Sequence, residues 1–288
     1  MYPAGESDID SRFIVLPSGE RVHVITSGPA DGVPVLLCHG WGACVYGWRA
    51  ILPSLTAAGC RVIAPDLRGH GRSDESDAPD AYTTPGMTGY LAAIVDALGI
   101  ERPIVVGHSM SGRVALEYAL AAPERVRGLA LLAPLGVGSL RKLVERTALV
   151  LALGAWLGPI AIRRSMIRVV VGAATGRLRR PSVRDIDEYW APTQWAKFGR
   201  AIYRLLRDFD WRALPTERIA ALPMPVVVVL GELDPLVVVE DPGTLAARLA
   251  PQRVLVVART GHIVTDEIPD TVSEALLELV APLVAGRE

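Results

Sequence analysis

Short runs of consecutive apolar residues alternate along this chain with longer segments in which apolar residues recur at helical spacing. The run from Ile104 to Val106 is β-branched, and a glycine-rich turn and a helical pattern ending at Pro123 follow it. Comparable runs stand at Val33–Cys38, Arg61–Pro65, Val126–Leu132, Pro225–Leu230 and Arg253–Val257. Continuous apolar runs are typical of parallel strands buried on both faces. The alternation therefore predicts an α/β fold, a mostly parallel sheet with helices on both faces.

Two stretches depart from this alternation. Arg12–Leu16 and Arg21–Thr26 flank a Pro-Ser-Gly-Glu turn, which predicts a hairpin at the sheet edge and is the only antiparallel signal. From 136 to 212 we find helical patterns but no clear strand, with fifteen Lys and Arg against six Asp and Glu. We therefore expect residues 136–212 to form a separate unit inserted between 1–135 and 213–288.

Composition narrows the class of protein. The chain has 288 residues, is 50% hydrophobic and carries a formal charge of −1, which favours a globular protein and gives no sign of a nucleic-acid partner. The three cysteines fit neither a disulfide framework nor a zinc site, and no motif suggests a metal or cofactor. The polar, acidic start is unlike a signal peptide, so we expect a cytoplasmic location.

The turn from Gly107 to Gly112 presents a candidate nucleophile. A serine between a buried strand and a helix is held in strained backbone geometry, and its neighbours two positions away must be small. Gly107 and Ser111 meet that need around Ser109. The backbone N–H of Met110 would stand at a helix N-terminus and face developing negative charge. The alternative is a glycine-rich turn with an incidental serine.

Two further residues follow predicted strands, Asp234 after the run ending at Leu230 and His262 after Val257. The carboxyl ends of parallel strands share one edge of a sheet, so Ser109, Asp234 and His262 should meet there. A serine hydroxyl needs a base to take its proton, and a carboxylate holds the imidazole in the required tautomer. The loop at 39–42 should supply a second oxyanion donor, the backbone N–H of Trp41.

These motifs together resemble those of the α/β-hydrolase fold superfamily. The resemblance rests on His39–Gly42, Asp66–Ser73, the turn at Gly107–Ser111, the acid after Leu230 and Gly261-His262, and it covers 12–135 and 222–285. It implies an eight-stranded sheet, a Ser109 nucleophile, a His262 base, an Asp234 acid and a helical cap over 136–212. Ser111 departs from the usual glycine but is also small. Epoxide-hydrolase-like and dehalogenase-like relatives need an aspartate where this chain has Ser109, so those reactions are disfavoured.

The substrate pocket is the least defined part of the interpretation. We expect Trp156, Trp190 and Trp195 of the cap to line it, although packing roles are equally open to them. Residues 148–162 form an uncharged stretch too short to span a membrane. It could be the core of the cap, an apolar wall of the acyl pocket or a patch that touches a membrane surface. The basic character of the cap could be a solvated face or a preference for acidic substrates.

The function expected is a serine hydrolase that cleaves carboxylic esters of lipophilic small molecules through an acyl-enzyme, without cofactor. A carbon–carbon bond hydrolase or a perhydrolase on the same three residues is the enzymatic alternative. A ligand-binding, receptor-like protein on a hydrolase fold is the alternative from another class. The sequence leaves the natural substrate, the stereochemical preference and the oligomeric state open.

Overall fold

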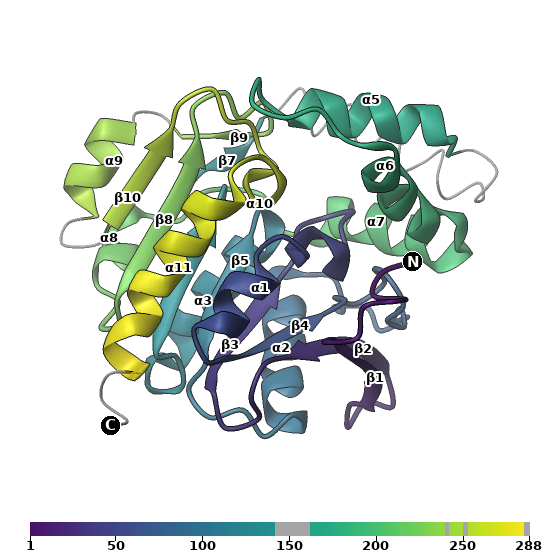
Figure 1. Cartoon of the computed structure of the whole chain (residues 1–288), viewed down its shortest axis with the longest axis horizontal. Helices are drawn as coiled ribbons and strands as arrows, with labels where there is room; N and C mark the ends of the chain where they lie inside the picture. Colours follow the sequence, from purple (N-terminus) through teal and green to yellow (C-terminus); the bar gives the residue numbers. More distant parts are fainter. Residues whose placement is uncertain (142–161, 240–241, 250–252, 285–288) are drawn as a thin grey trace.

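A twisted eight-stranded sheet runs through the centre of the molecule (Figure 1). The computed structural model describes residues 1–141, 162–239, 242–249 and 253–284. The strand order is β1-β2-β4-β3-β5-β6-β8-β10, and every neighbouring pair from β4 to β10 is parallel. The strands are β1 Asp10–Val15, β2 Arg21–Ser27, β3 Val33–Cys38, β4 Cys60–Pro65, β5 Ile104–His108, β6 Gly128–Leu132, β8 Val226–Gly231 and β10 Arg253–Val257.

The expected mostly parallel sheet is thus confirmed, with one correction at its edge. The predicted hairpin β1–β2 is present, but β2 also pairs antiparallel with β4, so antiparallel pairing is not restricted to the hairpin. A second correction is a two-stranded sheet formed by β7 Ser139–Leu140 and β9 Val237–Val238. β7 lies in the span that we expected to be free of strands. Two residues are too few to show a period in the sequence.

Apolar side chains form two cores, one on each face of the sheet. Alternate residues of β5 show the arrangement, because Val105 belongs to one cluster and Ile104 and Val106 belong to the other. The first cluster includes side chains of α2 Thr84–Ala97, α3 Met110–Ala121, α8 Thr216–Ala220 and α9 Pro242–Arg248. The second includes side chains of α1 Leu52–Ala57 and α11 Pro269–Val284. Shorter helices are η1 Val45–Trp48, η2 Pro123–Arg125 and α10 Val264–Glu267.

The described part of 136–212 is mainly helical after β7. Its helices are α5 Arg164–Ala174, α6 Val183–Trp190, η4 Ala191–Gln194 and α7 Ala196–Asp208. Figure 1 shows α5, α6 and α7 gathered together beyond one edge of the sheet. Side chains of α7 extend the first core cluster, whereas Val171 of α5 and Ile186 of α6 belong to the second. Most of the apolar stretch at 148–162, including Trp156, lies outside the described residues.

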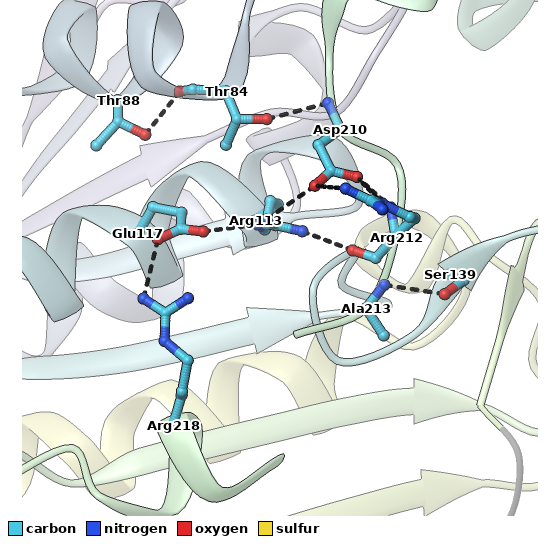
Figure 2. Close-up of polar contacts among 9 residues, drawn as sticks. All are labelled: Thr84, Thr88, Arg113, Glu117, Ser139, Asp210, Arg212, Ala213 and Arg218. Atoms are coloured by element: carbon cyan, nitrogen blue, oxygen red, sulfur yellow. Dashed lines mark hydrogen bonds and ion pairs between the residues drawn. The ribbon is translucent and has the colours of Figure 1, made fainter. Parts of the chain in front are cut away.

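The segment that follows α7 is fastened to the helix that begins after Ser109 (Figure 2). Arg113 of α3 is buried, and its guanidinium donates a 2.6 Å hydrogen bond to the carbonyl of Arg212 and contacts Asp210. The backbone N–H of Asp210 donates to the Thr84 hydroxyl at the start of α2. The return from the inserted segment into the sheet is therefore held by polar contacts with α2 and α3.

Candidate active site

The turn between β5 and α3 holds Ser109 in strained backbone geometry. Its φ of 56° and ψ of −118° lie outside the regions that most residues other than glycine adopt. A Cβ at Gly107 would stand 2.5 Å from the carbonyl oxygen of Ser111, and one at Gly112 would stand 2.5 Å from Pro134 Cβ. Close packing therefore requires glycine at Gly107, which the sequence led us to expect to be small, and also at Gly112.

Ser111 has a further role in this turn that its size alone did not reveal. Its hydroxyl donates to the carbonyl of Cys38 at the end of β3 and accepts the backbone N–H of His108 at 2.9 Å. A glycine could make neither contact. Ser111 therefore links the turn after β5 to the neighbouring strand.

Ser109, His262 and Asp234 come together at the carboxyl edge of the sheet, from the loops after β5, β10 and β8. His262 Nε2 lies 2.8 Å from Ser109 Oγ, and Nδ1 lies 2.8 Å from Asp234 Oδ2. Ser109 and His262 are both buried. When Nδ1 carries the proton that Asp234 accepts, Nε2 is free to receive the hydroxyl proton of Ser109.

Asp234 is held in its ionised form. Burial raises the pKa of the Asp234 carboxyl, but the interaction with His262 and two backbone hydrogen bonds together outweigh burial and lower the pKa below its usual value. Those bonds come from the N–H groups of Leu236 and Val237, which donate to Oδ1 at 2.8 and 3.0 Å. Each carboxylate oxygen therefore has a separate task, Oδ1 in fixing the loop and Oδ2 in binding the imidazole.

The two expected oxyanion donors differ in their surroundings. Met110 is the first residue of α3, so its N–H is one of the unpaired groups of a helix N-terminus. Neither this N–H nor that of Trp41 donates a hydrogen bond to another residue within the described ranges. The Trp41 indole N–H, by contrast, donates to the carbonyl of Ile202 in α7 at 3.3 Å.

The other histidines are engaged in packing contacts. His39 Nδ1 lies 2.8 Å from the Gly40 carbonyl, and its Nε2 accepts the N–H of Leu67. His70 accepts the N–H of Gly42. Burial lowers the pKa of His70 and of His108 to about 3, so both rings are neutral at physiological pH. His23 of β2 is paired with buried Asp66, with Nδ1 2.7 Å from Oδ2.

A buried carboxylate beside His262 escaped the sequence analysis. Glu267 accepts the N–H of Gly261 at 3.0 Å and the N–H of Gly176, beyond the end of α5, at 2.7 Å. Burial raises its pKa. In the sequence, the pair Asp266 and Glu267 looks like charge on a helix surface. The one sequence feature that could have pointed to Glu267 was its position five residues after His262.

The expected pocket residues remain a prediction. The indole N–H of Trp190 donates a 3.0 Å hydrogen bond to the carbonyl of Ile162. Trp195 is 36% exposed, with the Lys197 ammonium 5.0 Å from its ring centre. Trp156 lies outside the described residues. Within the described ranges, neither Trp190 nor Trp195 makes a hydrogen bond or ring contact with Ser109 or His262.

Comparisons with known proteins agree on the fold. Residues 33–156 match the family model for the alpha/beta hydrolase fold. Epoxide hydrolase 3 of Siraitia grosvenorii is 38% identical over 112 residues, which are 39% of this chain and 35% of that protein. A carboxylesterase of Bacillus subtilis is 19% identical with a TM-score of 0.77, covering 94% of this chain and 91% of its own. A 2-hydroxy-6-oxo-6-phenylhexa-2,4-dienoate hydrolase of Rhodococcus sp. strain RHA1 is 24% identical with a TM-score of 0.76, covering 94% and 99%.

The strand order, the family match and these structures together define the class. The chain has the α/β-hydrolase fold. Its match spans only about a third of the length of the curated epoxide hydrolase named above. In the parts of the chain that the structure describes, none of the helices combines the length and apolar character that a bilayer span requires.

Proposed function

We propose that this protein is a serine hydrolase that cleaves carboxylic esters of lipophilic small molecules. The observation that carries the proposal is the continuous pair of 2.8 Å contacts from Ser109 Oγ to His262 Nε2 and from His262 Nδ1 to Asp234. A serine, an imidazole and an ionised carboxylate in this order form the arrangement that activates a hydroxyl toward an acyl carbon.

Each residue then has one task. Ser109 Oγ attacks the ester carbonyl while His262 Nε2 takes its proton, and Asp234 stabilises the imidazolium. The N–H groups of Trp41 and Met110 would bind the oxyanion, each worth about a hundredfold in rate. His262 returns the proton to the departing alcohol. Water, deprotonated by His262, attacks the acyl-enzyme, and collapse releases the acid and restores Ser109.

The identity of the nucleophile argues against epoxide opening, the activity named for the matched plant relative. A carboxylate that opens an epoxide forms an ester, which water can hydrolyse to release the product. A serine that opened an epoxide would form an ether, which the same three residues have no means to cleave. The match covers only about a third of that relative, so it does not indicate which substrate this chain accepts.

Carbon–carbon bond hydrolysis is the second candidate, favoured by the likeness to the Rhodococcus dienoate hydrolase. The likeness to a carboxylesterase is equally close in TM-score, 0.77 against 0.76. Since both identities are below a quarter, the fold does not separate the two reactions. We favour esters because the general acyl-transfer chemistry needs no group beyond those just described.

We further propose that α5, α6 and α7, with the rest of 136–212, form a cap over this site. Support comes from contacts that join these helices to loops after the strands. The hydroxyl of Tyr46, after β3, donates to Asp185 of α6 at 2.8 Å. Arg49, seven residues after Gly42, binds both Asp185 and Asp266. The acyl group would then lie between the cap and Ser109, with Trp156, Trp190 and Trp195 as candidate pocket residues.

The decisive experiment compares p-nitrophenyl esters of graded acyl length for wild type, Ser109→Ala and Ser18→Ala. Ser18 lies in the exposed turn of the edge hairpin and serves as the matched control. We expect turnover in wild type and Ser18→Ala, loss of at least about a thousandfold in Ser109→Ala, and labelling of Ser109 by a fluorophosphonate.

Other outcomes discriminate the alternatives. Turnover of a vinylogous diketone without ester turnover would favour the carbon–carbon bond hydrolase. Absence of both activities and of fluorophosphonate labelling would leave a ligand-binding protein. Strong preference for acetyl over octanoyl esters would contradict the lipophilic pocket while leaving the nucleophile intact.

A further inference from the structure

Helix α5 carries apolar side chains on two faces. One face is buried, with Val171 and Ala174 packed toward the protein. The other face is open to solvent, where Val169 is 69% and Val170 is 50% exposed. Its members recur at positions i, i+3, i+4 and i+7, which is one side of a helix, and form what we call the outer stripe: Met166, Val169, Val170 and Ala173.

The segment that carries the outer stripe is rich in arginine. Residues 162–184 contain seven arginines and no acidic residue. Three of these arginines pair with carboxylates elsewhere, on Asp187, Asp185 and Glu6. The other four are exposed, and none lies within ion-pair distance of a carboxylate in the described ranges: Arg163, Arg168, Arg177 and Arg180.

We propose that the outer stripe and these four arginines form a docking surface for an anionic lipid bilayer. A helix with a narrow apolar face and basic flanks lies in the plane of a membrane interface, where valine side chains enter the acyl boundary and arginines meet phosphate. Apolar side chains gain nothing from a nucleic acid. Two copies of the same arginine-rich surface repel one another, which opposes self-association.

The position of α5 connects this surface with the candidate site. Figure 1 shows α5 at the outer margin of the helices beyond the sheet. Its last residue, Ala174, accepts the backbone N–H of His262 at 2.8 Å. Docking through the outer stripe would therefore bring the His262 loop close to the lipid surface. Access to bilayer-dissolved esters rests on the proposed function, whereas docking itself does not.

The test is co-sedimentation of the full chain with vesicles, which requires no catalysis. Vesicles of phosphatidylcholine alone are compared with vesicles of phosphatidylcholine and phosphatidylglycerol in equal parts. We expect binding to the second kind only, weakening as salt screens the arginines. Arg168→Gln should lower the partition coefficient about fivefold, and Val169→Ser about tenfold. Matched controls are Arg102→Gln and Val15→Ser, which are exposed on other parts of the molecule.

Several results would overturn the proposal: no binding to anionic vesicles, equal loss in the control variants, or binding that Arg168→Gln and Val169→Ser leave unchanged. Concentration-dependent dimerisation that Val169→Ser abolishes, without vesicle binding, would assign the stripe to a second copy. Turnover of a water-soluble short ester should be unchanged in Val169→Ser. That control separates a failure of docking from a failure of the proposed hydrolase chemistry.

Discussion

The backbone N–H of His262 donates a 2.8 Å hydrogen bond to the carbonyl of Ala174, the last residue of α5. The candidate base is therefore held by the inserted segment as well as by Asp234. The two backbone segments can approach closely because each has a glycine at this point, Gly176 and Gly261. A Cβ at Gly176 would stand 2.5 Å from the backbone nitrogen of Gly261. Any shift of the segment after α5 must therefore also displace the loop that carries His262.

Glu267 joins these two backbones, so its replacement should disturb catalysis. Its Oε2 accepts both the Gly176 and the Gly261 N–H groups. Oε1 lies 3.1 Å from the Gly261 nitrogen, so in Glu267→Gln an amide nitrogen in place of Oε1 would set two donors against each other there. We expect kcat for an ester substrate to fall about ten- to a hundredfold because His262 is displaced from Ser109. Steady-state kinetics over a range of pH measures this loss.

Glu274→Gln, an exposed replacement in α11, is the matched control and should retain wild-type kcat. A Glu267→Gln protein with full activity would show that the contact is not needed to position His262. A protein that loses its cooperative thermal transition would instead reveal a structural role, so melting curves accompany the kinetics.

Asp234→Asn should impair proton transfer without loosening the loop. Asp234 Oδ1 accepts two backbone N–H groups, and the amide oxygen of asparagine can replace it there. The amide nitrogen then faces His262 Nδ1 as a donor, which forces the imidazole proton onto Nε2. A base protonated on Nε2 cannot accept from Ser109. We expect kcat to fall by about 10⁴ with little change in melting temperature.

Glu232→Gln provides the comparison, since Glu232 is an exposed neighbouring carboxylate that accepts a backbone N–H from Arg259. Its kcat should stay close to that of wild type. If Asp234→Asn were equally active, the carboxylate would not set the tautomer of His262. Asp234 would then not be the acid of the site, even though its Oδ2 lies 2.8 Å from His262 Nδ1.

Local patterns were sufficient for the sheet. The run Val33–Cys38 was predicted with the bounds that β3 has, because apolar side chains in succession have few other ways to be buried. The turn at Ser109 could also be predicted, because the small residues Gly107 and Ser111 meet a local steric demand. The meeting of Ser109, Asp234 and His262 followed from the rule that parallel strands end at a common edge.

Long-range polar contacts could not be read in the same way. The pairs His23–Asp66 and Arg49–Asp185 join residues 43 and 136 positions apart, and each partner alone looks like a surface residue. The strands β7 and β9 form because two loops meet and pair. Each strand has only two residues, which is too short for a hydrophobic pattern to be recognised in the sequence. The pocket was the least predictable part, because it depends on how the inserted helices pack over the sheet.

Acid should destabilise the protein through its buried neutral histidines. The pKa values of His70 and His108 fall from 6.5 to about 3 because burial disfavours their charged forms. The unfolded chain therefore binds more protons than the folded one between these values. Stability rises with pH across this window and is lost as pH falls from 6.5 toward 3. Each histidine contributes a slope of up to about 1.4 kcal/mol per pH unit.

Urea denaturation at several pH values within this window tests the expectation. His70→Gln, which retains an acceptor for the Gly42 N–H, should flatten the slope by about one proton equivalent. The deeply buried carboxyl of Asp66 contributes in the same direction only at lower pH, because its own pKa is depressed. A slope that is identical in wild type and His70→Gln would show that His70 titrates normally in the folded protein.

Arg113 should be more important for stability than Arg218, although both contact Glu117 (Figure 2). Arg113 is buried, and its loss leaves the Arg212 carbonyl and the Asp210 carboxylate without their partner from α3. We expect Arg113→Leu to lower the free energy of unfolding by about 2 kcal/mol. Arg218 is 48% exposed at its side chain, so Arg218→Leu should cost less than about 0.5 kcal/mol. Equal destabilisation in the two variants, measured by urea denaturation, would show that the Glu117 contact matters and that the connection to the segment after α7 does not. A larger loss in Arg113→Leu, together with a lowered kcat, would mean that this connection also steadies the helix that begins after Ser109.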